Sequence, residues 1–261
     1  MDAPGIIGAV FLGLILGSFA TALSYRVPRG ISIAAVKRSR CPACRKSLGV
    51  PDLVPLLSWV FLKGRCRHCG ARIGWRYPLI ELATLALCLA FYAVYGLTAE
   101  TFLIFALAPV LVSILDIDLH HKIIPDSLNM AILLTGVGLL FVNALLAGSP
   151  LDFILSKGVN AAGGSLLYGL GSLLLRQGAM AVMRREPMGI GDVKFYAAAG
   201  FWLGLNAEAA ALFMIVSGFS GMIAALLWKK RTGEAEAPFG PALVIAFIAA
   251  LLFYVPAFMG G

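Results

Sequence analysis

Residues 101–126 read TFLIFALAPVLVSIL followed by DIDLHHKIIPD. The first part, Thr101–Leu115, is an apolar run without a charged side chain, which is typical of a helix inside a membrane. The second part, Asp116–Asp126, brings together three carboxylates, two imidazoles and one ammonium group. Ionised groups at a membrane boundary are costly unless they are paired or hydrated, so this cluster indicates a functional site.

The composition of the whole chain agrees with a membrane protein. Of its 261 residues, 60% are hydrophobic and only 13% are charged, whereas a soluble domain has roughly 45–50% apolar residues. The length leaves room for about eight helices of roughly 20 residues and one insertion outside the bilayer. We therefore predict an all-α integral membrane protein with about eight transmembrane helices.

Basic residues are concentrated in one segment of the chain. Of the 21 lysines and arginines, twelve lie between Arg26 and Arg76, where Asp52 is the single acid. Such an excess is typical of a loop on the cytoplasmic side of a membrane. We therefore attribute the net charge of +8 to membrane topology. We expect the lipid bilayer, and not nucleic acid, as a partner of the chain.

These patterns divide the chain into three predicted regions. They are a first transmembrane helix at 1–25, a cytoplasmic loop at 26–77 and the remaining transmembrane helices at 78–261. Arg26 and Arg29 follow the first helix and no basic residue precedes it, so we expect an uncleaved anchor with its N-terminus outside.

Two pairs of cysteines lie in the predicted loop. They are Cys41-Pro-Ala-Cys44 and Cys66-Arg-His-Cys69, with 21 residues between the pairs. This spacing is typical of a structural zinc site, because each pair offers two thiolates to one tetrahedral ion. Two disulfides are the alternative, but they require an oxidising compartment. We predict that the four cysteines bind one zinc ion that holds the shape of the loop.

A second acidic motif, Gly189-Ile-Gly-Asp192, lies at the start of another apolar run. If the chain alternates sides from an external N-terminus, Asp118 and Asp192 reach the same membrane face. Two carboxyl groups that share a site hold one proton between them near neutral pH, and can therefore hydrolyse a peptide bond by acid–base catalysis. The alternative is that Asp118 pairs with Lys122 or His121 and that Asp192 caps a helix. The residues alone leave both interpretations open.

Seven motifs in order give the chain a resemblance to a known family. They are Gly17-Ser-Phe19 with Tyr25-Arg-Val-Pro28, the two cysteine pairs, Pro55-Leu-Leu-Ser-Trp59, Lys63-Gly-Arg-Cys66, Arg76-Tyr-Pro-Leu-Ile-Glu81, Asp116-Ile-Asp118 through Ile124-Pro-Asp126, and Gly189-Ile-Gly-Asp192. Together they resemble the bifunctional type IV prepilin peptidases, which are membrane aspartyl proteases of the G-x-G-D class. The sequence departs from the family pattern at Thr21, where the family usually has Asn.

The resemblance implies two reactions and a cellular location. The protease is expected to use Asp118 and Asp192 to remove the leader of prepilins or pseudopilins, after a Gly and before a residue that is commonly Phe. The new N-terminal amine is then expected to be methylated with S-adenosylmethionine. The family associates the zinc loop at 26–77 with methylation and the region 78–261 with proteolysis. The expected location is the bacterial inner membrane, with the active site facing the cytoplasm, in a type IV pilus or type II secretion system.

Several points stay open from the sequence. No glycine-rich nucleotide loop is visible, so the residues that hold the methyl donor are unassigned, with Ser18, Arg76 and Glu81 as candidates. The oligomeric state and the particular pilin are also unassigned. Two alternative functions are an ion-coupled carrier, which would favour acids at mid-membrane, and a zinc-ribbon assembly protein without protease activity.

Overall fold

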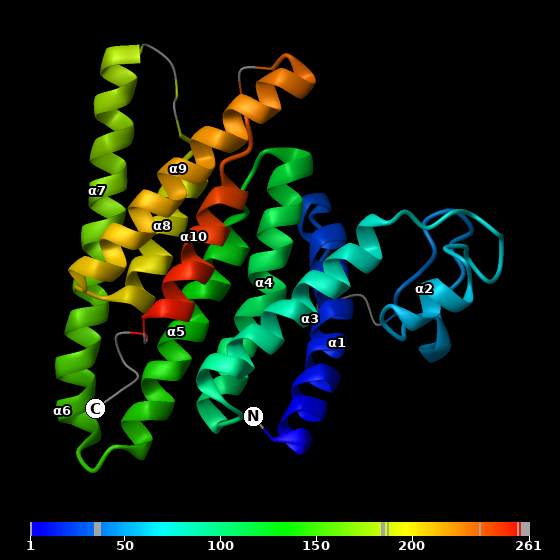
Figure 1. Ribbon diagram of the computed structural model, residues 1–261, viewed down its shortest axis with the longest axis horizontal. Helices are drawn as coiled ribbons and strands as arrows, with labels where there is room; N and C mark the ends of the chain where they lie inside the picture. The colour runs from blue at the N-terminus through cyan, green and yellow to red at the C-terminus, as the bar shows by residue number, and fades with distance from the viewer. Residues whose placement is uncertain are drawn as a thin grey trace. The chain divides into compact units, whose positions relative to one another are not determined.

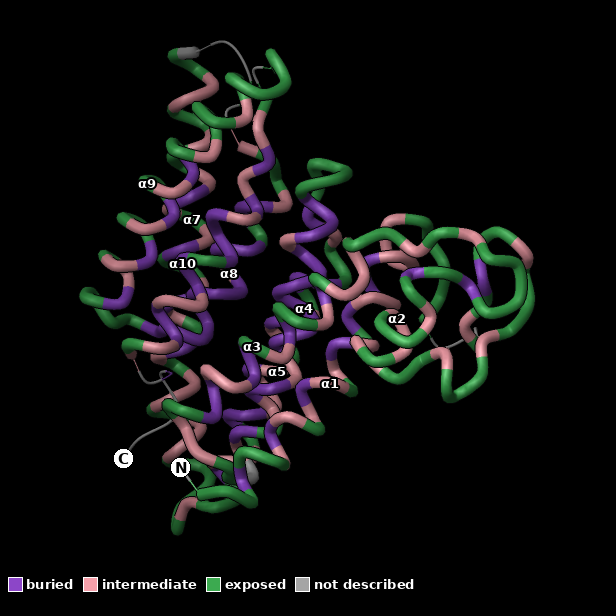
Figure 2. Tube along the Cα trace, turned by 45° about the vertical axis from the view of Figure 1, so that its right-hand side comes forward, coloured by how far each residue is buried: buried purple, intermediate pink, exposed green. Residues whose placement is uncertain are grey.

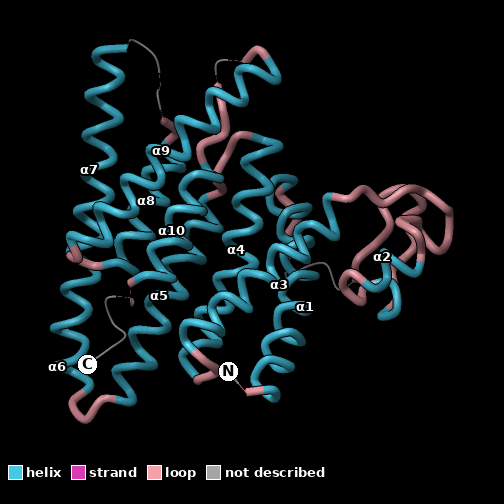
Figure 3. The backbone as a smooth tube through the Cα atoms, viewed as in Figure 1, coloured by secondary structure: helices cyan, strands magenta, loops and turns pink. Residues whose placement is uncertain are grey.

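The computed structural model describes residues 2–33, 38–183, 186, 188–234, 236–254 and 256. The regular structure of these residues is helical, with no strand among them (Figure 3). This confirms the predicted all-α class. The chain forms two compact units, Met1–Ser113 and Ile114–Gly261. The boundary falls inside one continuous helix, α4, which runs from Ala99 to His121.

The first unit is built on two helices that pack side by side, α1 (Ala3–Arg26) and α3 (Arg76–Tyr95) (Figure 1). Glycines bring their backbones together. A Cβ atom on Gly17 would lie 3.0 Å from the Cα atom and from the carbonyl oxygen of Glu81. Because Gly17 has no side chain, the first turns of α3 can lie directly against α1.

The segment between α1 and α3 has little regular structure. It contains the short helices Val27–Arg29, Val50–Asp52 and α2 (Leu57–Phe61), and two isolated bridges, Arg40 to Ser47 and Arg65 to Arg72. Among its described hydrophobic residues, only Cys41 and Cys66 are buried. A segment with so small a core needs another source of rigidity, such as a bound metal.

The second unit contains the C-terminal part of α4 and the helices that follow. They are α5 (Asp126–Leu146), α6 (Pro150–Phe153), a π-helical turn (Ile154–Gly158), α7 (Val159–Met183), α8 (Ile190–Leu203), α9 (Ala207–Thr232) and α10 (Gly240–Phe253). The centre of this unit is α8, which packs against α5, α7, α9 and α10 and is buried over most of its length (Figure 2). Its Phe195 and Trp202 are fully buried, together with Phe213 of α9 and Phe247 of α10.

Each of the eight predicted apolar runs forms a helix, but the helices differ in length. Six described segments are long and apolar enough to cross a bilayer; they begin at Ala3, Arg76, Glu100, Asp126, Pro150 and Ala207. The helices α8 and α10 have 14 residues each, which is about 21 Å of helix and less than the hydrocarbon core of a bilayer. Neighbouring helices cover α8 on most sides, so its length need not match the bilayer. Arg184, Arg185 and Met259 lie outside the described residues.

Candidate functional site

Asp118 lies in the last turn of α4, and its side chain points into the second unit. The residue is only 4% exposed. Its Oδ2 atom accepts a hydrogen bond of 2.7 Å from the backbone N–H of Gly240, the first residue of α10. The N-terminus of a helix carries a partial positive charge, so α10 favours a carboxylate at this position.

Asp192 is the third residue of α8 and is 8% exposed. Its Oδ2 atom accepts a hydrogen bond of 2.9 Å from the backbone N–H of Gly189, which precedes the helix. The other glycine of the motif, Gly191, packs closely against Ile124. A Cβ atom at this position would lie 2.9 Å from the carbonyl oxygen of Ile124. The G-x-G-D turn can therefore lie directly against the Ile124-Pro125 step.

Both acids lie in the second unit, and the segments that carry them are in contact. Gly191, next to Asp192, packs against Ile124, six residues after Asp118. Of the two basic partners considered for Asp118, Lys122 forms an ion pair with Glu234 instead. His120, on the same turn of α4, has its Nδ1 atom 3.5 Å from Oδ1 of Asp116. The alternative interpretation also assigned Asp192 to capping a helix. Asp192 does cap α8, because its side chain accepts a hydrogen bond from the N–H of Gly189.

In each carboxyl group, one of the two oxygens accepts a hydrogen bond from the backbone. In both residues Oδ2 is occupied by a backbone N–H, from Gly240 or Gly189. Among the described residues, no hydrogen bond is made to Oδ1 of either carboxyl group. Two such oxygens at one site are suited to general acid–base catalysis.

Sequence reasoning missed two residues of this site. Asn129 of α5 is 5% exposed, and its Nδ2 donates a hydrogen bond of 3.0 Å to the carbonyl oxygen of Gly191. Its buried Oδ1 has no hydrogen-bond partner among the described residues. A buried amide inside an apolar run was the available signal. Gly240 is the other missed residue, and nothing in its local sequence indicates a contact with a residue 122 positions away.

The four cysteines of the first unit form one cluster. Their sulfur atoms all lie within 4.8 Å of one another, and Cys41 Sγ lies 3.9 Å from Cys69 Sγ. All four are free cysteines. The spacing and the tetrathiolate donor set fit one tetrahedral zinc ion, as the sequence predicts.

Both cysteine pairs have the same local backbone structure. In the first, the N–H of Cys41 donates to the carbonyl of Lys46, and the N–H of Arg45 donates back to the carbonyl of Cys41. The second pair repeats this pattern between Cys66, Ala71 and Gly70. Arg45 and Gly70 both have positive φ, at 59° and 70°. The turns orient both thiols of each pair toward one point, and backbone N–H groups of His68 and Cys69 lower the pKa of the Cys66 thiol to about 7.

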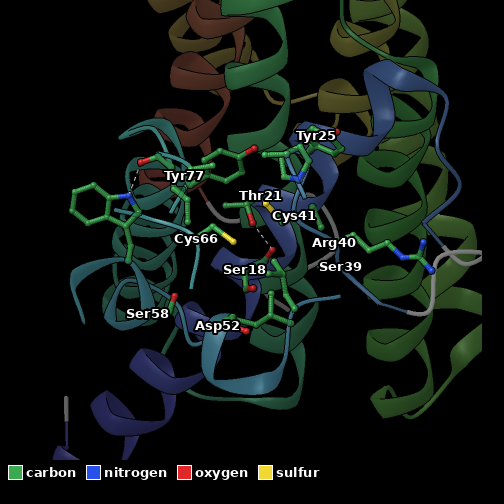
Figure 4. Close-up of a pocket in the computed structure, with 18 of the residues that line it drawn as sticks. Ser18, Thr21, Tyr25, Ser39, Arg40, Cys41, Asp52, Ser58, Cys66 and Tyr77 are labelled. Carbon is green, nitrogen blue, oxygen red and sulfur yellow. Dashed lines mark hydrogen bonds between the residues drawn. The ribbon is translucent and has the colours of Figure 1, made fainter. Parts of the chain in front are cut away.

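A cavity of about 650 Å³ lies in the first unit beside this cluster (Figure 4). Ser18, Thr21 and Tyr25 of α1 line one part of it, and Cys41 and Cys66 line another. Thr21 is held in place by a hydrogen bond of 2.7 Å from its Oγ1 to the carbonyl of Ser18. Thr21, where the sequence departs from the family pattern, lines the cavity. The volume is typical of a pocket for a small-molecule ligand.

Two acids line the cavity, and their surroundings differ. Asp52 accepts hydrogen bonds from the N–H of Gly49 and from Arg67, at 3.0 and 2.7 Å. Glu81 of α3 is half-buried and accepts a 2.7 Å hydrogen bond from the N–H of Leu56. Of the three candidates for the methyl-donor site, Ser18 and Glu81 line the cavity and Arg76 does not.

The backbone at Leu56 has an unfavourable conformation that Glu81 helps to hold. Leu56 has φ of 60°, which is rare for a branched side chain. The N–H of Leu57 donates to the carbonyl of Pro55 across it, at 2.6 Å, forming a strained three-residue turn. Backbone strain of this kind beside a cavity is a frequent feature of binding sites.

Comparison with known proteins gives matches over both units. The model of the Bacterial Peptidase A24 N-terminal domain matches residues 11–95, which include the four cysteines, and that of the Type IV leader peptidase family matches residues 103–227, which include both aspartates. The type 4 prepilin-like proteins leader peptide-processing enzyme of Escherichia coli O78:H11 is 34% identical, over 92% of this chain and 90% of that protein. The prepilin leader peptidase/N-methyltransferase of Bacillus subtilis is also 34% identical, over 92% and 91%.

The chain belongs to the type IV leader peptidase family. A third member, the prepilin leader peptidase/N-methyltransferase of Burkholderia pseudomallei, is 32% identical over 96% of this chain and 86% of that protein. No solved structure matches the chain. As a bacterial type IV leader peptidase family member with six long apolar helices, the chain is a multi-pass membrane protein.

Proposed function

We propose that this chain removes the leader peptide of prepilins or pseudopilins with Asp118 and Asp192. We also propose that it methylates the new N-terminal amine in the cavity of the first unit. The observation that carries the first part is the presence of two buried carboxyl groups in the second unit, each accepting at Oδ2 a hydrogen bond from a backbone N–H. Relatives named prepilin leader peptidase/N-methyltransferase support both parts.

The cleavage chemistry follows from a single proton shared by the two acids. The ionised carboxylate removes a proton from a water molecule, and the resulting hydroxide attacks the carbonyl carbon of the scissile peptide bond. The protonated carboxyl group donates its proton to the leaving nitrogen as the C–N bond breaks. The cycle ends with one proton again on the pair.

The cavity of the first unit has side chains suited to the methyl donor. S-adenosylmethionine supplies the methyl group when bound. Tyr25 and Tyr77 offer aromatic faces for a base, Arg26 offers a guanidinium for a carboxylate, and Glu81 offers a carboxylate for a cationic amine. The acceptor amine must lose a proton before methylation, and Glu81 is placed to receive it. These proposed roles extend the methylation machinery from the loop at 26–77 to Tyr25 of α1 and Glu81 of α3. We assign proteolysis to the rest of 78–261.

Zinc has a structural role in this proposal. Cys41, Cys44, Cys66 and Cys69 would hold the ion with four thiolates, which closes a tetrahedral coordination sphere. Cys41 and Cys66 also line the cavity, so the cluster fixes one of its walls.

The proposed location of both sites is the cytoplasmic face of the inner membrane. The excess of basic residues between Arg26 and Arg76 supports it. Reporter fusions test it: fusions at Gly148 and Asn206 should report the outside, and one at Lys230 the inside. An external signal at Lys230 would contradict the proposed topology.

The test of the cleavage function uses full-length protein in membranes, a prepilin substrate and a mature pilin as methyl acceptor. Asn has the size of Asp but cannot exchange a proton, so Asp118→Asn and Asp192→Asn should each lower leader cleavage by at least about a hundredfold. Both variants should still methylate the mature pilin, because the cavity lies in the other unit.

The same assay separates the alternatives. A zinc-ribbon assembly protein or an ion-coupled carrier would give no leader cleavage even in the wild type. Cleavage by both Asn variants at the wild-type rate would exclude Asp118 and Asp192 as the catalytic residues.

A further inference from the structure

Two interactions connect the segment between Thr232 of α9 and Gly240 of α10 to the end of α4. In one, Gly240 donates its N–H to Asp118. In the other, Glu234 forms an ion pair with Lys122, and the indole N–H of Trp228 also donates to Glu234, at 3.2 Å. Asp118 and Lys122 are one helical turn apart. The segment is therefore held across the turn of α4 that carries the acid.

The contact between Gly240 and Asp118 leaves no room for a side chain. A Cβ atom on Gly240 would lie 2.8 Å from Oδ2 of Asp118 and 2.9 Å from both its Cβ and its Cγ. These distances are far below ordinary van der Waals contact. Any other residue at this position would displace either the carboxyl group or the N-terminus of α10.

Gly240 is also the main donor that α10 offers to the carboxylate. The next residue is Pro241, which has no N–H, and the N–H of Ala242 donates to the carbonyl of Phe239 at 3.0 Å. The hydrogen bond from Gly240 thus determines which oxygen of Asp118 is occupied and which is available for chemistry.

A second glycine supports this arrangement from α9. Gly221 is buried, and a Cβ atom there would overlap the ring of Phe239, the residue before Gly240. Gly218, three positions earlier in α9, is exposed and has no atom within 4 Å of its Cβ position. The two glycines therefore offer a matched pair, one in contact with the segment before α10 and one free of it.

We propose that Gly240 is a positioning residue for leader cleavage and that Gly221, through Phe239, sets its placement. Gly240 holds Oδ2 of Asp118 so that Oδ1 faces the reacting water or peptide. Because Gly221 has no side chain, the ring of Phe239 can pack close to α9. This places the N–H of Gly240 within hydrogen-bond distance of Asp118 Oδ2. This inference rests on the proposed role of Asp118 in cleavage.

The experiment compares Gly240→Ala, Gly221→Ala and Gly218→Ala in full-length protein reconstituted in membranes. A misplacement of about 1 Å can lower a rate by about a hundredfold. We expect Gly240→Ala to lower kcat for leader cleavage by about that factor, Gly221→Ala to lower it by about tenfold and Gly218→Ala to leave it unchanged. KM should change little in all three, because none of these residues is proposed to bind the leader. Methylation of mature pilin should also be retained.

A rescue separates positioning from general destabilisation. Phe239→Leu shortens the side chain that the methyl group added by Gly221→Ala would displace. The double variant Gly221→Ala/Phe239→Leu should therefore recover kcat relative to Gly221→Ala. Equal kcat for Gly221→Ala and Gly218→Ala would overturn the role of Gly221. Wild-type kcat in Gly240→Ala would overturn the whole inference.

Failure of the inference differs from failure of the proposed function. Asp118→Asn measured alongside decides between them. If it abolishes cleavage while Gly240→Ala does not, Asp118 acts without help from Gly240. If Asp118→Asn cleaves normally, the assignment of the acid itself is wrong.

Discussion

The two units build their sites in different ways. In the first unit the cysteine cluster uses residues 41–69, a short segment with few helices, and its geometry depends on shared thiolate ligands. In the second unit the carboxyl pair draws on α4, α8 and α10, and backbone N–H groups hold it. A local site that depends on one ion should fail completely when one ligand is lost. A site assembled by helix packing should respond in graded steps.

The sites also differ in the space around them. The first unit contains a cavity of about 650 Å³ lined by apolar side chains together with charged ones such as Arg26 and Glu81, which suits a small ligand with both apolar and charged parts. The acids of the second unit are buried, and the close approaches at Gly191 and Gly240 are filled by Ile124 and by Asp118 itself. The difference fits the proposal that the chain carries out two different reactions.

The largest expected effect comes from removing a cysteine ligand. Cys66→Ser should lose the zinc, which we expect at about one ion per chain, and should lower methylation to background, because a structural zinc site is not formed without its full set of ligands. Leader cleavage should stay close to wild type. The measurements are metal content, methyl transfer to mature pilin and leader cleavage in the same preparation.

Cys88→Ser is the matched control, since Cys88 is a buried cysteine of α3 outside the cluster. It should retain both zinc and methylation. Chelation of the wild type should reproduce Cys66→Ser and be easier at lower pH, because metal binding needs deprotonated thiolates. If Cys66→Ser removed cleavage as completely as methylation, the two units would not be functionally separate.

The cysteine cluster could be predicted from sequence because its ligands follow a spacing rule. Each C-x-x-C pair forms its own local turn. The clustering of the four thiols can therefore be predicted without knowledge of the wider fold. Asp118 and Asp192 were selected as the catalytic pair with the help of the family resemblance, because the residues alone also allow a structural role for both. Both aspartates are buried in the second unit, and their catalytic role stays a prediction.

Residues that act through the backbone could not be predicted in this way. The N–H of Gly240 carries no sequence signal, and its contact with Asp118 depends on how α9 and α10 pack. Glu81 was visible as an acid near the start of α3, but its bond to the N–H of Leu56 requires the conformation of the loop. The end of α10 at Phe253 was also hard to predict, because apolar residues continue beyond it and composition does not show how far a helix extends.

A smaller effect is expected at Glu81. Glu81→Gln keeps the size of the side chain but loses its charge, so it weakens a charge-assisted hydrogen bond and removes the proposed proton acceptor. Such bonds contribute about 1.5–3 kcal/mol, so methylation should fall by about tenfold to a hundredfold. Leader cleavage should be unchanged. The measurement is kcat and KM for methyl transfer to a mature pilin.

Asp52→Asn is the control for Glu81, because Asp52 is the other acid of the cavity. The backbone N–H of Gly49 and the guanidinium of Arg67 hold the pKa of Asp52 below its usual value, so its charge is already engaged. This variant should affect methylation much less. Equal losses in the two variants would indicate that the cavity responds to net charge and not to Glu81 itself.

The smallest effect should come from the acids beside Asp118. Asp126 forms an exposed ion pair with Lys194 at 2.7 Å, linking the Ile124-Pro125 segment to α8, and exposed pairs contribute roughly 0.2–1 kcal/mol. Asp126→Asn should therefore lower leader cleavage by less than about fivefold. Asp116→Asn should also be mild, because Asp116 lies beside His120 and not in the carboxyl pair.

This last comparison also tests the assignment of the pair itself. Residues two apart on a helix do not share a face, so Asp116 and Asp118 of α4 cannot exchange roles without a change in the side from which the peptide approaches. If Asp116→Asn abolished cleavage and Asp118→Asn did not, the hydrogen bond from Gly240 would hold a structural acid. The reacting pair would then have to be sought on the opposite face of α4. If Asp118→Asn alone abolishes cleavage, the acid held by α10 is the one that reacts.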